Sequence, residues 1–301
     1  MKTFDELREH IIGKNRRWRI AVACAADEST RTAVATALEN GLVEAFFVGD
    51  TEAVKADGRL MHSGSFVHTI DAIDDHDAAA KAVALVKEGI ADVLMKGLLN
   101  TDILLKAILD KQNGLLPQGN VLTHITIAQL PMYDKLLMFS DGAVIPFPTL
   151  QQRLQQVKYM VDLCHDFGID QPRIALTHCT EKTNVKTFPV TADYETIVQE
   201  ARNGRFGNCI IDGPLDVKTS CSLHSLQLKG IDSPIQGKAD ALIFPDIEAG
   251  NTFYKTITLF AQAQAAATLQ GTSAPVVLPS RGDDTMAKFN SIIMALAQCL
   301  H

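Results

Sequence analysis

Short apolar runs alternate with longer amphipathic stretches along the whole chain, a pattern typical of buried strands separated by helices. The pattern predicts strands at 19–25, 43–48, 66–70, 91–95, 121–129, 136–139, 173–177, 209–211, 241–244 and 274–279. It predicts helices at 29–40, 75–88, 100–112, 150–167, 192–203, 250–270 and 285–300, with a further helix near the N-terminus. Continuous apolar strands that alternate with helices indicate an α/β fold, with mostly parallel sheets covered on both faces.

The last of these apolar runs leads directly into a loop that carries several reactive groups. Ser280, Arg281, Asp283 and Asp284 supply a hydroxyl, a guanidinium and two carboxylates just before the C-terminal helix. In open α/β sheets, ligands bind at the carboxyl ends of the strands. A hydrogen-bond donor, an anion clamp and a candidate base at that position predict chemistry on a phosphorylated or otherwise anionic substrate.

Composition and charge narrow the function further. The 301 residues are enough for two domains, and an apolar fraction of 47% excludes a disordered chain. The formal net charge of −7 argues against a protein that binds nucleic acid or a membrane surface, because such proteins need a basic surface. An anionic substrate must therefore be bound by a local basic site.

Several other features indicate a cytoplasmic protein without a bound metal. The six cysteines form no C-x-x-C pair, which is typical of reduced thiols in the cytoplasm. No apolar run reaches the length of a membrane-spanning helix, and the N-terminus does not have the pattern of a signal peptide. The nine histidines show no metal-ligand spacing such as H-E-x-x-H.

Several short motifs resemble one enzyme family over nearly the whole chain. They are KGLLNT at 96–101, YDKLL at 133–137, SDGA at 140–143, DGPL at 212–215 and FPDIEAGNTFYK at 244–255. In the same order along the chain, and followed by the Ser-Arg loop, they resemble the phosphate acetyl/butyryltransferase family. The first two motifs are more similar to the butyryl branch than to the acetyl branch.

The resemblance implies two α/β/α domains like those of isocitrate and isopropylmalate dehydrogenases, with an active cleft between them, and a homodimer or higher homo-oligomer. The first domain would be discontinuous, joining 1–130 to 271–301, and the second would span 131–270. The implied reaction moves a short acyl group, butyryl before acetyl, between coenzyme A and orthophosphate. Coenzyme A, acyl-CoA, phosphate and acyl phosphate are then the partners, with coenzyme A a substrate and no separate cofactor.

The resemblance implies catalytic roles for three residues of the C-terminal loop. Ser280 would donate a hydrogen bond to the developing oxyanion or to the thiol, and Arg281 would hold phosphate or a phosphate of coenzyme A. Asp283 would be the general base, with Asp284 a close rival that can instead cap the following helix. The acetyl branch places its catalytic Asp seven residues after the Ser, where this chain has Ala287.

A second group of candidates follows the strand predicted at 91–95. The acetyl branch has a phosphate-binding Arg in the next helix, where this chain has Leu105 and then Lys106, and Lys106 fits a surface position. We expect Lys96 to supply the missing cation, because a strand end followed by a helix N-terminus attracts anions; the alternative is a solvated loop lysine. Asn100 and Thr101 would bind substrate or cap that helix.

A third group follows the strand predicted at 241–244. Asp246 and Asn251 lie at the strand-to-helix turn and would position substrate, although Asp246 can equally cap the helix. Asn251 and Lys255 are four residues apart and so share one helix face. Asp212 is a weaker candidate at another strand end.

Two other functional classes stay open at this point. An NAD-linked decarboxylating dehydrogenase would share the fold, but it needs a compact aspartate cluster for a divalent metal, and none is evident. A non-catalytic sensor of acyl-CoA would share the scaffold, but it would not need the base in the Ser280 loop. Phosphate acetyltransferase is the alternative within the family.

Overall fold

The computed structural model describes residues 2–49, 51–280 and 282–300, and they form two compact units. The discontinuous unit joins Phe4–Leu122 to the chain from Gln264 onward, and the middle unit is Thr123–Ala263. Both contain parallel strands connected through helices, so the predicted α/β fold with mostly parallel strands is confirmed. The boundaries between the two units fall after residues 122 and 263, somewhat earlier in the chain than the boundaries predicted after residues 130 and 270.

The discontinuous unit is built around strands in the order β3-β2-β1-β4-β11-β10. Its strands are β1 (Trp18–Ala23), β2 (Val43–Gly49), β3 (Val67–Asp71), β4 (Val93–Lys96), β10 (Gln264–Gln270) and β11 (Val276–Val277). Its helices are α1 (Phe4–Ile12), α2 (Glu28–Glu39), α3 (Glu52–Lys55), α4 (Gly58–His62), α5 (Asp75–Lys87), α6 (Thr101–Ile108) and α12 (Thr285–Gln298), with a 3-10 turn at Gly64–Phe66. All neighbouring strands run parallel except β10 and β11.

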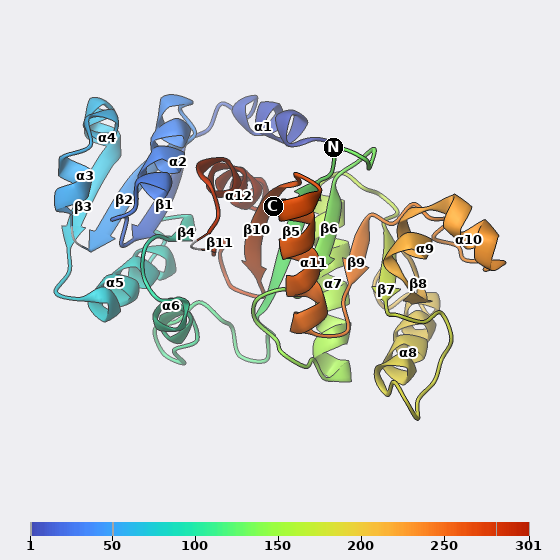
Figure 1. The fold of residues 1–301 in the computed structure, drawn as a ribbon. Coiled ribbons are helices and arrows are strands. Elements are labelled where there is room, and N and C mark those ends of the chain that lie inside the picture. Colours follow the sequence, from blue (N-terminus) through green and yellow to red (C-terminus); the bar gives the residue numbers. More distant parts are fainter. Residues whose placement is uncertain (1, 50, 281, 301) are drawn as a thin grey trace. The chain divides into compact units, whose positions relative to one another are not determined.

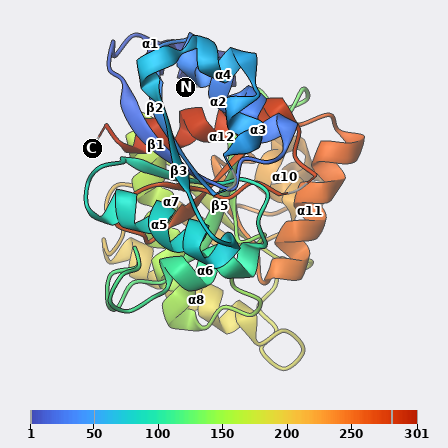
Figure 2. The ribbon, with the colours of Figure 1, turned by 90° about the vertical axis from the view of Figure 1, so that its left-hand side faces the viewer.

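Helices cover both faces of this sheet. Figures 1 and 2 show α5 and α6 on one face and α1, α2 and α12 on the other. Helix α12 is apolar on nearly every side, with Ile292, Ile293, Met294 and Leu296 fully buried. Its central position explains why the C-terminal segment must return to the sheet that the N-terminus begins: without it, α2 and β10 would lose their packing partner.

The middle unit has the strand order β5-β6-β9-β7-β8, with β5 antiparallel to β6 and the other pairs parallel. Its strands are β5 (Thr123–Gln129), β6 (Leu137–Ser140), β7 (Arg173–Thr177), β8 (Ile210–Leu215) and β9 (Ala241–Ile243). Its helices are α7 (Leu150–Asp166), α8 (Val190–Arg202), α9 (Val217–Cys221), α10 (Leu223–Lys229) and α11 (Ile247–Phe260). Phe139 of β6 packs edge-on against Phe253 of α11, which joins sheet and helix in one core.

The prediction of one continuous helix over 250–270 is wrong for its second half. Helix α11 ends at Phe260, the backbone turns through Gln262 at a φ of 52°, and β10 follows. Ala and Gln favour helices when considered alone. Here the segment pairs antiparallel with β11, Thr268 opposite Val277, and buries most of its side chains, so tertiary contacts decide its conformation.

Two smaller differences arise from local turns. Helix α6 ends four residues before its predicted end at 112, because the Asp110 side chain accepts hydrogen bonds from the amides of Gln112 and Asn113 and forms a turn. The short helices α3, α4, α9 and α10 were not predicted, since four to seven residues are too few for a clear helical period. Among the described residues, no helix is long and apolar enough to cross a membrane.

Candidate active site

Three neighbouring parallel strands of the discontinuous unit end at one edge of its sheet. Ala23 of β1 lies opposite Lys96 of β4, and Met95 of β4 lies opposite Val277 of β11. The loops that leave these strands therefore meet, as the rule for ligand sites in α/β sheets requires. A pocket of about 70 Å³ lies between them, lined by Asp27, Ser29, Lys96, Gly97, Leu98, Pro279, Ser280 and Lys288.

Lys96 is the last residue of β4 and is only 2% exposed. Its Nζ donates hydrogen bonds to the carbonyl oxygens of Gly97 at 3.1 Å and Leu99 at 3.3 Å. The alternative of a solvated loop lysine is therefore wrong. Gly97 is required beside it, because a Cβ there would lie 2.2 Å from the carbonyl oxygen of Cys24.

The Ser280 loop is organised by its two carboxylates in different ways. Asp283 Oδ2 accepts a hydrogen bond from the amide of Ser280 at 2.8 Å, and the Ser280 side chain is exposed at the pocket. Asp284 is the N-cap of α12 and accepts from the amide of Ala287 at 2.8 Å. The capping role considered for Asp284 is thus confirmed. Arg281 lies outside the described residues.

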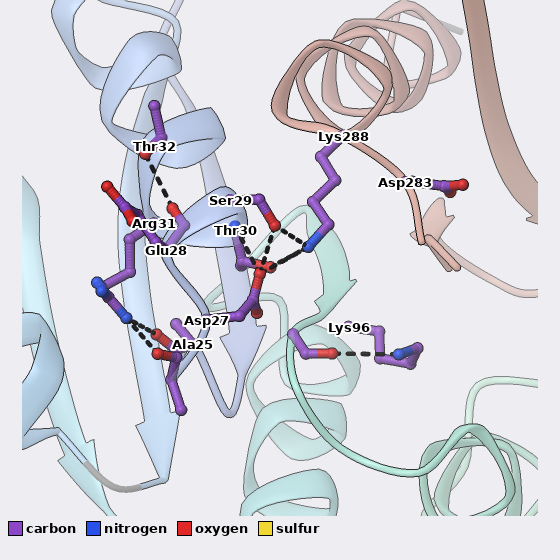
Figure 3. A network of polar contacts seen from close by, with 12 residues as sticks. Ala25, Asp27, Glu28, Ser29, Thr30, Arg31, Thr32, Lys96, Asp283 and Lys288 are labelled. Atoms are coloured by element: carbon purple, nitrogen blue, oxygen red, sulfur yellow. Dashed lines mark hydrogen bonds and ion pairs between the residues drawn. The ribbon is translucent and has the colours of Figure 1, made fainter. Parts of the chain in front are cut away.

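Lys288 and Asp27 were missed by sequence reasoning but form the most connected polar group of the pocket (Figure 3). Lys288 comes from the first turn of α12 and is 4% exposed. Its Nζ lies 2.6 Å from Asp27 Oδ1, 2.6 Å from Ser29 Oγ and 3.0 Å from Thr30 Oγ1. The sequence does carry a signal for a buried Lys288, because this lysine lies four residues before Ile292 and so shares the apolar face of the helix.

The charge state of Asp27 follows from these contacts. Burial opposes its ionisation, but hydrogen bonds from Lys288 and from neighbouring residues outweigh the burial and hold the pKa of Asp27 well below its usual value. Asp27 also caps α2 by accepting from the amide of Thr30 at 2.8 Å. Asp27 and Lys288 therefore form an ion pair in the wall of the pocket.

Asn100 and Thr101 lie farther along the same loop. Asn100 is the N-cap residue of α6 by backbone position, although its side chain makes no capping hydrogen bond. Thr101 is the first residue of that helix. Neither belongs to the described lining of the pocket, so their predicted contact with substrate stays a prediction.

The third group of candidates belongs to the middle unit. Asp246 is the N-cap of α11 and accepts from the amide of Ala249 at 2.8 Å, so its capping role is confirmed. Asn251 Nδ2 donates to the carbonyl oxygen of Gly142 at 2.9 Å, which fixes α11 to the turn after β6. Lys255 is exposed, with its Nζ 4.7 Å from the centre of the Tyr254 ring.

A second, wider pocket of about 550 Å³ lies beside Asp246. Its lining is mainly apolar and consists of Val217, Phe244, Asp246, Glu248, Ala249, Thr252, Phe253 and Thr256. Asp212, the weakest candidate, lies on β8 and accepts a hydrogen bond from Ser233 Oγ at 2.5 Å. In the part of the chain that the structure describes, no three His, Cys, Asp or Glu side chains are grouped so that they could hold a metal ion.

An α/β protein with a small polar pocket, lined by two lysines, at the carboxyl ends of its parallel strands is the class that this fold and pocket define. Residues 59–296 match a family model described as "Phosphate acetyl/butaryl transferase". The chain therefore belongs to the phosphate acetyl/butyryl transferase family, a family of acyltransferases.

Individual relatives agree with this assignment. A phosphate butyryltransferase from Clostridium acetobutylicum is 35% identical over 98% of this chain and 97% of its own length. A phosphate acetyltransferase from Thermotoga maritima is 32% identical over 97% of this chain and 98% of its own length. The crystal structure of a branched-chain phosphotransacylase from Enterococcus faecalis V583 has a TM-score of 0.83 and 28% identity, covering 94% of this chain and 99% of that one.

Proposed function

We propose that this protein transfers a short acyl group between coenzyme A and orthophosphate, and that it prefers butyryl to acetyl. Near full-length membership of the phosphate acetyl/butyryl transferase family carries the proposal. The pocket supports it, because two buried lysines and a serine hydroxyl at one sheet edge are suited to an anionic substrate. The motifs KGLLNT and YDKLL, which resemble the butyryl branch, support the chain-length preference.

In the direction that forms acyl-CoA, the thiol of coenzyme A loses its proton to Asp283 and its sulfur attacks the carbonyl carbon of the acyl phosphate. The carbonyl oxygen becomes negatively charged in the tetrahedral intermediate, and Ser280 donates a hydrogen bond to it. As the intermediate collapses, the bond from carbon to the phosphate oxygen breaks and phosphate leaves. Lys96, with Arg281, stabilises the phosphate charge.

The experiment is an assay of free coenzyme A released from acetyl-, propionyl- and butyryl-CoA with phosphate present. Two additional buried methylenes contribute about 1.6 kcal/mol, so kcat/KM for butyryl-CoA should exceed that for acetyl-CoA by about fifteenfold. A preference for acetyl-CoA would make the protein a phosphate acetyltransferase. No release with any of these substrates would contradict the proposal as a whole.

We also propose that the enzyme works in the cytoplasm as a homodimer or higher homo-oligomer and needs no metal or other cofactor. Full activity after exhaustive dialysis against a chelator is the expected result for the metal. Light scattering coupled to size exclusion measures the oligomeric state, and a monomer at assay concentration would contradict that part of the proposal.

A further inference from the structure

The pocket beside Ser280 concentrates positive charge in a small space. Lys96 and Lys288 come from different elements, β4 and α12, and both are almost completely buried. A buried ammonium is unfavourable unless it is paired or hydrogen-bonded. The lining also holds the hydroxyls of Ser29 and Ser280, and Asp27 supplies its single carboxylate.

The two oxygens of that carboxylate are used unequally. Asp27 Oδ1 accepts from Lys288 Nζ, from Ser29 Oγ and from the amide of Thr30. Asp27 Oδ2 is buried and has no hydrogen-bond partner among the described residues. A buried acceptor without a donor carries a desolvation cost, so such a group needs a reason to persist. A ligand that brings its own donor removes that cost.

We propose that this pocket binds phosphate in a protonated form, with Asp27 Oδ2 accepting the hydrogen bond of its P–OH group and Lys96 and Lys288 attracting its unprotonated oxygens. The inference rests on the proposed function, because it assigns residues to the phosphate of that reaction. It makes Asp27 a residue that determines specificity among tetrahedral anions. Sulfate carries no proton at neutral pH, so a sulfate oxygen would meet the carboxylate with no hydrogen between them.

The test compares phosphate with sulfate in the wild type and in Asp27→Asn. An asparagine still caps α2, and its amide can donate to a sulfate oxygen. We expect sulfate to inhibit the wild type weakly, and the ratio of the sulfate Ki to the phosphate KM to fall at least tenfold in Asp27→Asn. Loss of a negative charge alone would strengthen the binding of both anions equally, so an unchanged ratio of sulfate Ki to phosphate KM would overturn the inference.

Asp57→Asn is the matched control, because Asp57 also caps a helix and pairs with an arginine but lies outside the described lining of the pocket. Its ratio should equal that of the wild type. If Asp27→Asn does not fold, thermal shifts of the wild type decide the question. Phosphate and arsenate, which both keep a proton at neutral pH, should raise Tm, and sulfate at equal concentration should not.

These outcomes separate the inference from the function on which it rests. Normal release of coenzyme A with an unchanged anion ratio would contradict the role of Asp27 alone. Absence of release would contradict the proposed function, and the thermal shifts would still test the anion selection. Equal stabilisation by phosphate and sulfate would overturn that selection in either case.

Discussion

The general base offers the sharpest test of the Ser280 loop. Asp283 Oδ2 accepts from the amide of Ser280 at 2.8 Å. In Asp283→Asn the amide oxygen can keep this hydrogen bond, so the loop should retain its conformation while losing the group that accepts a proton. If Asp283 deprotonates the thiol, kcat in the acyl-CoA-forming direction should fall by about 10²–10⁴, with little change in the KM for coenzyme A.

Asp284→Asn is the control for this prediction. Asparagine caps helices about as well as aspartate, so α12 and its contact with the amide of Ala287 should persist and kcat should fall less than about tenfold. Both variants are assayed with butyryl phosphate and coenzyme A, and circular dichroism verifies their folding. The reverse order of effects, with Asp284→Asn nearly inactive and Asp283→Asn nearly normal, would refute the reasoning.

Three further predictions concern other parts of the chain. Lys96→Met should raise the phosphate KM by about tenfold or more, because a hydrogen bond to a charged group contributes about 1.5–3 kcal/mol. Lys106→Met, on the exposed face of α6, is the control and should leave this KM unchanged. The same phosphate KM in Lys96→Met and the wild type would place the phosphate elsewhere. A hydrogen bond from Arg59 holds the pKa of Asp57 at about 2, below its ordinary 3.8. The wild type should therefore have a higher Tm than Asp57→Asn at neutral pH, and this difference should fade as the pH falls from 3.8 to 2. A Tm difference that grows on acidification would contradict this. Cys179 is exposed, whereas the other five cysteines are buried or partly buried, so a thiol reagent should modify one thiol rapidly in the folded protein. A fast phase of modification that persists in Cys179→Ser would show that another thiol is accessible.

Much of the fold was predictable because several of its strands, such as β1 and β4, are short, apolar and largely buried. The run predicted at 19–25 forms β1 and the run predicted at 91–95 forms β4, and their alternation with helices indicates a parallel sheet. Segment 250–270 shows the limit of local pattern. Its second half has helix-forming residues, but pairing with β11 is decided by a partner strand that follows in the chain.

The site was predictable only in part, for a similar reason. Lys96 ends one buried strand and Ser280 follows another, and the rule for strand ends places both at one edge of the sheet. The pair of Asp27 with Lys288 joins residues 261 positions apart. A lysine on the apolar face of a helix indicates a buried partner, but nothing local in the sequence says which carboxylate it is.

The most direct test of the central claim is a product analysis of butyryl-CoA incubated with phosphate and this enzyme. Phosphorus NMR follows butyryl phosphate while a thiol reagent follows free coenzyme A. The account predicts equal amounts of both products, and no coenzyme A when phosphate is omitted. Coenzyme A that appears with free butyrate, or that appears equally without phosphate, would show hydrolysis of the thioester and would contradict acyl transfer to phosphate.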